Sequence, residues 1–360
     1  MARGYVAHRR GNHDAWRYGF SFWDSLRNGA AAEAEREAAA RVADQSGPDR
    51  LFEERDRLTL EPARRPESVR VAGYEVHLNA LGLRGPDVAL AKPAGVRRLL
   101  VLGGSFVFGW GLPDDQIWTT RLGDALSADR LVQVINGGRN GGTINWATMA
   151  WIRLSRRTAF DGVLLLSTYN NRTLVDVDGR PTWPAIAEYY LYNSSLLYVA
   201  LEEKVGQLRR QTADYQHRQA PVRVSSASLD NWRALYRRRL EQVATVCRER
   251  GARLIVGAEP QRFYDRALDS LEPGDAVVAS RLLQRVAEGR TISRSELEWL
   301  LQSVQIEEMR TLASHGDARF IDSANALPSD KSPWMIDEIH LNEGGSERFA
   351  RFVAERIGPF

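Results

Sequence analysis

Five short apolar runs that alternate with helical patterns constrain the fold of this chain most. The runs cover residues 98–103, 131–136, 162–167, 253–258 and 319–322. The helical patterns cover residues 116–127, 144–156, 229–250, 275–288 and 294–314, with a last helix expected to begin near Gly345. Because strands that alternate with helices form βαβ units, this pattern predicts a parallel sheet. We therefore expect an α/β protein with five parallel strands and an insertion between the third and fourth strands.

The chain before the sheet has a different character. Residues 1–65 include a segment rich in alanine and glutamate, which predicts an N-terminal helical arm. Residues 68–78 alternate apolar and polar side chains, which predicts a half-buried strand or hairpin, and residues 84–95 are interpreted as a linker. The predicted main domain is 66–360, with a helical and aromatic-rich insertion at about 172–250.

Composition excludes several classes of function. The chain has 49 basic and 46 acidic residues, and the basic residues are set among acids rather than in a stripe with aromatics, so we expect no nucleic-acid partner. The single cysteine excludes an internal disulfide framework and a cysteine-based metal cluster. No run of about 18 apolar residues occurs, so no membrane span is expected. No signal-peptide pattern is present either, and a cytoplasmic location is therefore the expectation.

Ser105 is expected at the carboxyl end of the first strand, where α/β proteins commonly have their active sites. It directly follows the first apolar run, and the pair Gly103-Gly104 lets the chain turn sharply there. Open α/β sheets bind their ligands at the carboxyl ends of the strands. A serine hydroxyl is a weak nucleophile unless a base takes its proton and donors stabilise the oxyanion. The rest of the chain should therefore supply a histidine, an orienting acid and hydrogen-bond donors.

His340 is the candidate base. Asp337 stands three residues before it, on a loop that leads into a helix. This spacing lets the carboxylate reach one imidazole nitrogen within a single turn, which leaves the other nitrogen free to face Ser105. A helix N-terminal acid beside a surface histidine is the alternative explanation of the spacing. The strand-end serine favours the pair as base and orienting acid.

Two loops at the same edge of the sheet offer oxyanion donors. The segment 134–143 reads VINGGRNGGT, and its glycines let backbone amides approach a ligand closely. Asn170 and Asn171 follow the third run, and an asparagine amide can donate to an oxyanion without changing protonation. The structural alternatives are a tight turn with positive φ in the first loop and an Asx turn in the second.

Other nucleotide and serine motifs do not fit the same residues. A G-x-S-x-G nucleophile elbow fails because Val107 stands where the last glycine should be. A phosphate-binding P-loop fails because Trp110 and Gly111 replace its Lys-Ser/Thr pair. No G-x-G-x-x-G follows the first strand and no H-E-x-x-H spacing occurs, so the motifs predict neither a dinucleotide nor a metal ion.

Four ordered blocks of the chain resemble the SGNH (GDSL-type) hydrolase family. The blocks are Gly-Gly-Ser105, Asn136 with Gly141 five residues later, Tyr169-Asn170-Asn171, and Asp337-x-x-His340. The similarity spans roughly residues 77–360, since Asn79-ALGLRGP-Asp87 also resembles a lead-in found in bacterial members.

The resemblance implies a three-layer α/β/α, flavodoxin-like fold and no cofactor. It implies Ser105 as nucleophile and His340 as base oriented by Asp337. The implied oxyanion hole consists of the Ser105 and Gly141 amides and the Asn170 side chain. The chain departs from the family at two places. Gly104 replaces the usual aspartate before the serine, and Thr168 and Asn171 replace the glycine and aspartate that flank the asparagine of the third block.

We expect a serine esterase that forms an acyl-enzyme on Ser105 and cleaves a small-molecule or glycan ester. One alternative is an O-acyltransferase that passes the acyl group to a sugar or metabolite hydroxyl, and another is a non-catalytic binding module. The expected substrate surface consists of side chains near the site and in the insertion, with ordinary core packing as the alternative. They are Phe106, Phe108, Trp110, Asn171, Trp183, Tyr189, Tyr190 and Tyr192.

Overall fold

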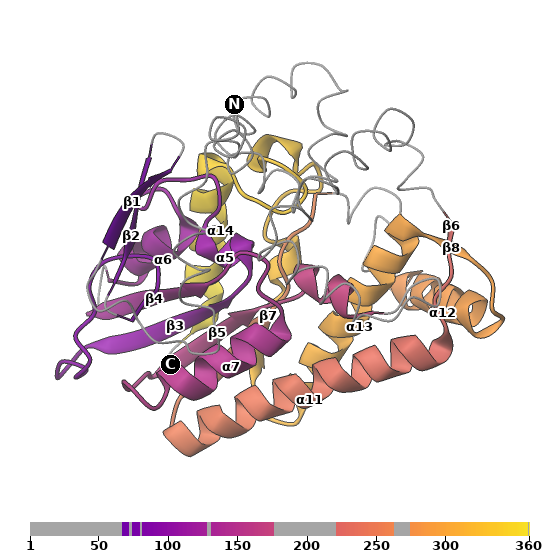
Figure 1. Ribbon diagram of the computed structural model, residues 1–360, viewed down its shortest axis with the longest axis horizontal. Helices are drawn as coiled ribbons and strands as arrows, with labels where there is room; N and C mark the ends of the chain where they lie inside the picture. Colours follow the sequence, from indigo (N-terminus) through magenta and orange to yellow (C-terminus); the bar gives the residue numbers. More distant parts are fainter. Residues whose placement is uncertain are drawn as a thin grey trace, which may run out of the picture. The chain divides into compact units, whose positions relative to one another are not determined.

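The computed structural model describes residues 67–71, 74–79, 81–127, 131–175, 221–262, 274–358 and 360 (Figure 1). The predicted N-terminal arm and the aromatic stretch of the insertion lie outside these residues. Within the described residues, the chain divides into two compact units. The first contains the segments up to Asn170, Arg237–Ala267 and Ile306–Phe360, and the second contains Asn171–Tyr236 and Leu268–Gln305.

The first unit contains a five-stranded parallel sheet, as predicted. Its strands are β3 (Arg97–Gly103), β4 (Val132–Gly138), β5 (Gly162–Leu166), β7 (Arg253–Gly257) and β9 (Arg319–Phe320). Their order in the sheet is β4-β3-β5-β7-β9, and every neighbouring pair is parallel. Counted along the chain this is the order 2-1-3-4-5 of flavodoxin-like folds. The expected fold class is therefore confirmed.

Helices cover both faces of this sheet. On one face, Leu99 and Val101 of β3 pack with α6 (Trp118–Ser127) and α14 (Glu343–Ile357). Trp118 and Phe349 meet edge to face there, with ring centroids 4.9 Å apart. Alternate strand residues point to the other face, where α7 (Ile144–Leu154) packs against β3 (Figure 1). Because both faces are covered, the central strands β3, β5 and β7 each contain a continuous apolar run.

The remaining elements of the first unit are short, apart from two long helices that it shares with the second unit. A hairpin of β1 (Glu67–Val71) and β2 (Tyr74–Leu78) precedes the sheet and confirms the predicted hairpin. The short helices are α5 (Ser105–Phe108) and the 3-10 turns Ser323–Asn325 and Ser332–Trp334. The last strand is shorter than the predicted 319–322, because the chain turns into the first of these 3-10 turns at Ser323.

The second unit is mainly helical. It contains α12 (Gly274–Ala287), the first turns of α11 (Ser226–Arg250) and α13 (Arg294–Ser314), and most of the 3-10 segment Tyr169–Leu174. A two-residue strand pair, β6 (Pro221–Val222) with β8 (Ile292–Ser293), closes one end. Strands this short have no readable period, which is why the sequence did not predict them. The predicted insertion, 172–250, is described only in part, and the second unit also draws on residues 268–305.

Candidate active site

Ser105 lies at the carboxyl end of β3, where α5 begins. Gly104 is the N-cap of α5, and Ser105 is 3% exposed. The buried Asn136 side chain, from the neighbouring strand β4, donates to the Val107 carbonyl (2.8 Å) and to the Thr119 hydroxyl (2.9 Å). These hydrogen bonds attach α5 to the end of β4. They fix the position of Ser105 relative to the end of the sheet.

Arg84 holds the loop that follows α5. Its guanidinium donates to the carbonyls of Phe108 (3.1 Å), Gly109 (3.0 Å) and Leu112 (2.6 Å), and to the Asp114 carboxylate (2.6 Å). The Arg84 side chain is completely buried. A buried guanidinium with four acceptors is a rigid support, because its planar fork fixes the direction of every donor. Sequence analysis placed this residue in a linker and missed this role.

Asp337, His340 and Ser105 form a continuous line of hydrogen-bonding distances. Nε2 of His340 lies 2.8 Å from the Ser105 Oγ, and Nδ1 of His340 lies 2.7 Å from Oδ2 of Asp337. The other carboxylate oxygen of Asp337 accepts from the amides of Ile339 (2.9 Å) and His340 (2.8 Å). His340 is 1% exposed. The structure therefore brings together the serine, histidine and acid that the sequence paired across 235 positions.

The electrostatics of this line favour an ionised acid. Burial by itself would raise the pKa of Asp337, because it penalises the charged form. The charge and the hydrogen bond of His340, together with the two backbone amides, outweigh that effect and hold the pKa below its ordinary value. A carboxylate in this position fixes the tautomer of the histidine and stabilises the imidazolium.

The candidate oxyanion donors lie beside Gly104. The Asn170 Nδ2 donates to the Gly142 carbonyl at 3.1 Å, and Gly141 has a φ of 66°, which favours glycine. The Ser105 amide begins α5, so it has no acceptor within that helix. A Cβ on Gly104 would lie only 2.5 Å from Nδ2 of Asn170. A side chain at this position would therefore clash with Asn170, so the glycine has a steric reason.

Glu259 is a buried acid that sequence analysis missed. It follows β7 and is 1% exposed. One of its carboxylate oxygens accepts from the Thr168 amide (2.6 Å), the Thr168 hydroxyl and the Tyr169 amide (2.9 Å). Burial raises the pKa of Glu259, and these hydrogen bonds oppose the rise only in part. An acid directly after the fourth apolar run was the signal available in the sequence.

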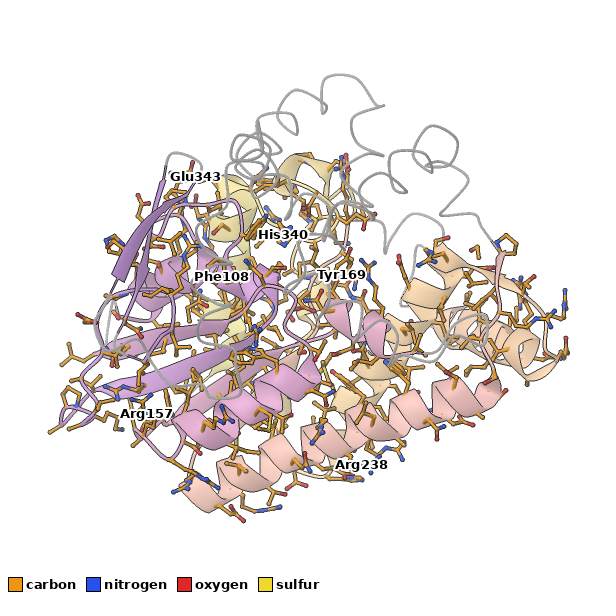
Figure 2. The ribbon with its side chains drawn as sticks, in the orientation of Figure 1. Phe108, Arg157, Tyr169, Arg238, His340 and Glu343 are labelled. Atoms are coloured by element: carbon orange, nitrogen blue, oxygen red, sulfur yellow. The ribbon has the colours of Figure 1, made fainter. Side chains whose placement is uncertain are left out.

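Tyr169 connects two of the loops that build the site. Its hydroxyl donates to Oε2 of Glu338 (2.9 Å), and the Glu338 carbonyl accepts from the Arg262 amide (2.8 Å). Figure 2 shows Tyr169 and His340 on the same side of the sheet, toward the carboxyl ends of its strands. The loop with Asn170 and the loop with His340 are thus joined by a side-chain contact.

The predicted substrate residues have varied environments. Phe106 is 3% exposed and packs on Phe349 at a centroid distance of 4.9 Å, and Phe108 is 1% exposed beneath the Arg84 guanidinium. These environments match the core-packing alternative rather than the role as pocket walls. Trp110 does lie near the site, with its ring centroid 6.3 Å from that of His340.

Asn171 is fully buried in the second unit. Its side-chain amide donates to Oε1 of Gln305 (2.7 Å), and its carbonyl accepts from the Trp232 indole (2.9 Å). These contacts give it a structural environment rather than the predicted substrate-facing one. The other expected substrate residues, Trp183, Tyr189, Tyr190 and Tyr192, lie outside the described residues.

The described residues contain neither a candidate metal cluster nor a membrane-spanning helix. None of these residues forms a group of three or more histidine, cysteine, aspartate or glutamate side chains suited to a metal ion. In the same part of the chain, no helix combines the length and apolar character needed to cross a membrane.

The chain is similar to several solved structures. A member of the lipolytic G-D-S-L family from Veillonella parvula is 14% identical, with a TM-score of 0.41 over 73% of this chain and 100% of that one. An α/β hydrolase from the metagenome of Lake Arreo is 13% identical, with a TM-score of 0.42 over 73% and 95%. An acetyl xylan esterase from Geobacillus stearothermophilus is 12% identical, with a TM-score of 0.40 over 73% and 94%.

Sequence comparisons gave no match. No protein-family model matches the chain. No curated protein matches it either. Structural similarities this low do not indicate a chemical activity, so the chemistry of the site is inferred from the chain's own side chains.

Proposed function

We propose that this protein is a serine esterase of the SGNH (GDSL-type) hydrolase family, with Ser105 as nucleophile, His340 as base and Asp337 as the orienting acid. The observation that carries the proposal is the unbroken contact from carboxylate to imidazole to hydroxyl, with distances of 2.7 and 2.8 Å. A serine needs this arrangement to attack a carbonyl at neutral pH. The four ordered sequence blocks support the same family.

In the proposed reaction, Nε2 of His340 takes the proton from Ser105 as Oγ attacks the ester carbonyl carbon. Asp337 keeps the other proton of His340 on Nδ1 and stabilises the imidazolium that forms. The negative oxygen of the tetrahedral intermediate accepts hydrogen bonds from the Ser105 and Gly141 amides and the Asn170 side chain.

The second half of the reaction uses the same groups. When the C–O bond to the leaving alcohol breaks, His340 gives that oxygen its proton and the acyl group stays on Ser105. His340 then takes a proton from a water molecule that attacks the acyl-enzyme. Breakdown of the second tetrahedral intermediate returns a proton to Oγ of Ser105 and releases the carboxylic acid.

Steady-state hydrolysis of a panel of 4-nitrophenyl acyl esters and acetylated sugars tests the proposal. Ser105→Ala and His340→Ala should each lower kcat by about 10³-fold or more, because the triad acts as a unit. Ser295→Ala and His315→Ala are matched controls at exposed positions of the described chain, and both should retain activity. A fluorophosphonate probe should label Ser105 in the wild type, as read by peptide mass spectrometry. Retained turnover in Ser105→Ala, or a wild type that neither cleaves nor labels, would overturn the proposal.

A further inference from the structure

The loop that carries Asn170 is attached to the end of β7 by one buried carboxylate. Glu259 accepts hydrogen bonds from the two consecutive backbone amides just before Asn170, those of Thr168 (2.6 Å) and Tyr169 (2.9 Å). Thr168 and Glu259 are each 1% exposed. Buried amides keep their acceptors because water is not there to replace them. The carboxylate therefore decides where the backbone of this loop lies.

A second contact fixes the Thr168 side chain to the same group. The Thr168 hydroxyl donates to the Glu259 carboxylate and accepts from the Glu259 amide at 3.2 Å. The chain has threonine here where the family has glycine. The side chain that departs from the family pattern thus takes part in the attachment to Glu259.

On its other side, the Asn170 amide is confined by the loops around Ser105. Its Nδ2 donates to the Gly142 carbonyl at 3.1 Å and lies close to Gly104. A shift of the backbone at 168–169 would consequently move Nδ2 relative to the Ser105 block. A displacement of about 1 Å in a catalytic group is enough to lower a rate by roughly 100-fold.

We propose that Glu259 is a positioning residue for ester cleavage, which holds the Asn170 side chain where it donates to the oxyanion. The proposal rests on the function proposed above. In this proposal Glu259 does not act on the ester or on the reacting atoms directly. It acts through the amides of Thr168 and Tyr169 on the residue that follows them.

Three variants test this role on an ester that the wild type cleaves. Glu259→Met removes the acceptor at similar volume and should lower kcat about 10- to 100-fold, with KM within about twofold of wild type. Glu259→Gln keeps an acceptor oxygen and should recover most of the lost kcat. Asn170→Ala should lower kcat by about 10²–10³-fold. The double variant Glu259→Met/Asn170→Ala should be no slower than Asn170→Ala, because both changes remove the same donor.

Asp161→Asn is the matched control. Asp161 also accepts from a backbone amide, that of Arg98 at 2.7 Å, but it precedes β5 and so lies at the opposite, amino edge of the sheet. The kcat of Asp161→Asn should match that of the wild type. If Glu259→Met does not fold, Thr168→Val replaces it, and a smaller loss of kcat that disappears in the Asn170→Ala background is expected.

The outcomes separate the two proposals. The positioning role would be overturned if the kcat losses of the two single variants multiplied in the double variant. It would also be overturned if Glu259→Met left kcat unchanged, or if Asp161→Asn lowered kcat as much as Glu259→Met does. For Thr168→Val, an unchanged kcat or a loss that multiplies with that of Asn170→Ala would overturn it as well. Each of these results would leave labelling of Ser105 by the fluorophosphonate intact. Failure of the wild type to label or cleave would instead overturn the proposed function.

Discussion

An alanine at position 104 would place a methyl carbon 2.5 Å from Nδ2 of Asn170. To restore an ordinary contact of 3.4 Å, the amide has to move by about 0.9 Å. The hydrogen bond from Asn170 to the Gly142 carbonyl, now 3.1 Å, then lengthens or breaks. The backbone at Gly104 is extended, with a φ of −86°, so alanine itself introduces no strain there.

This change should lower the rate of the reaction more than the stability of the fold. The closest obstructing atom is the end of a side chain, and turning such a side chain away from its rotamer costs about 0.5–1.5 kcal/mol. The backbone oxygen of Gly142, 3.2 Å from the new carbon, has to give way only slightly. Loss of one oxyanion donor lowers kcat by about 10²–10³-fold, which corresponds to about 2.7–4 kcal/mol of barrier. We therefore expect Gly104→Ala to fold normally and to hydrolyse esters at least 100-fold more slowly.

The assay is kcat on a cleaved ester together with urea unfolding of the same preparation. Gly123→Ala is the matched control, because a Cβ there meets Val134 at an ordinary 3.7 Å within α6. It should keep kcat and gain up to about 1 kcal/mol of stability. A Gly104→Ala enzyme with kcat within twofold of wild type would refute the reasoning. A loss of kcat that merely followed a loss of folded protein would refute it too.

Three further predictions concern ionisable groups. Asp337→Asn should lower kcat about 10³–10⁴-fold on the same ester, as in other triads, and a loss under tenfold would contradict its role. Although burial tends to raise the pKa of Asp161, hydrogen bonds, chiefly from Lys92, hold it below its ordinary value. The stability that ionised Asp161 gives to the folded protein is therefore complete above about pH 4 and is lost as pH falls further. The free energy of unfolding of Asp161→Asn, measured in urea, should accordingly depend less on pH in the acid range than that of the wild type. Burial raises the pKa of Cys247 to about 12, so maleimide should label it only in urea, and rapid labelling of the folded protein would contradict that.

The strands of the sheet were predictable because burial on both faces leaves a continuous apolar run. Residues 99–102 and 163–166 are examples, since no polar side chain interrupts either run. The line from Asp337 through His340 to Ser105 was predictable for a different reason. Ser105 follows a strand directly, and Asp337 and His340 have a characteristic spacing before a helix, so residue type and position alone reveal all three.

The environments of Phe106 and Phe108 were not predictable in the same way. Both lie within three residues of the proposed nucleophile, and an aromatic residue there can face either a substrate or the core. In α5 they turn toward Phe349 and Arg84, which come from opposite ends of the chain. Sequence position does not report contacts of this kind, because they depend on how distant segments pack.

The role of Glu259 was not predicted because it depends on residues that follow the neighbouring strand in the sheet. A lone acid after a strand predicts only a polar loop. The role of Glu259 depends on the amides of Thr168 and Tyr169, which are 91 and 90 positions away in the sequence. These amides approach it because β5 and β7 are neighbours in the sheet. Strand order, which the sequence pattern did not specify by itself, is therefore what reveals such a residue.

The Arg84 contacts bear on where this chain could be shortened. A chain shortened to begin at Val96 would retain every strand of the parallel sheet and all three members of the proposed triad. It would lack the guanidinium that holds the carbonyls of Phe108, Gly109 and Leu112. The loop after the nucleophile would then have to find other donors or rearrange. Domain limits drawn from strands and proposed reacting groups alone would thus cut away the guanidinium that supports the loop after Ser105.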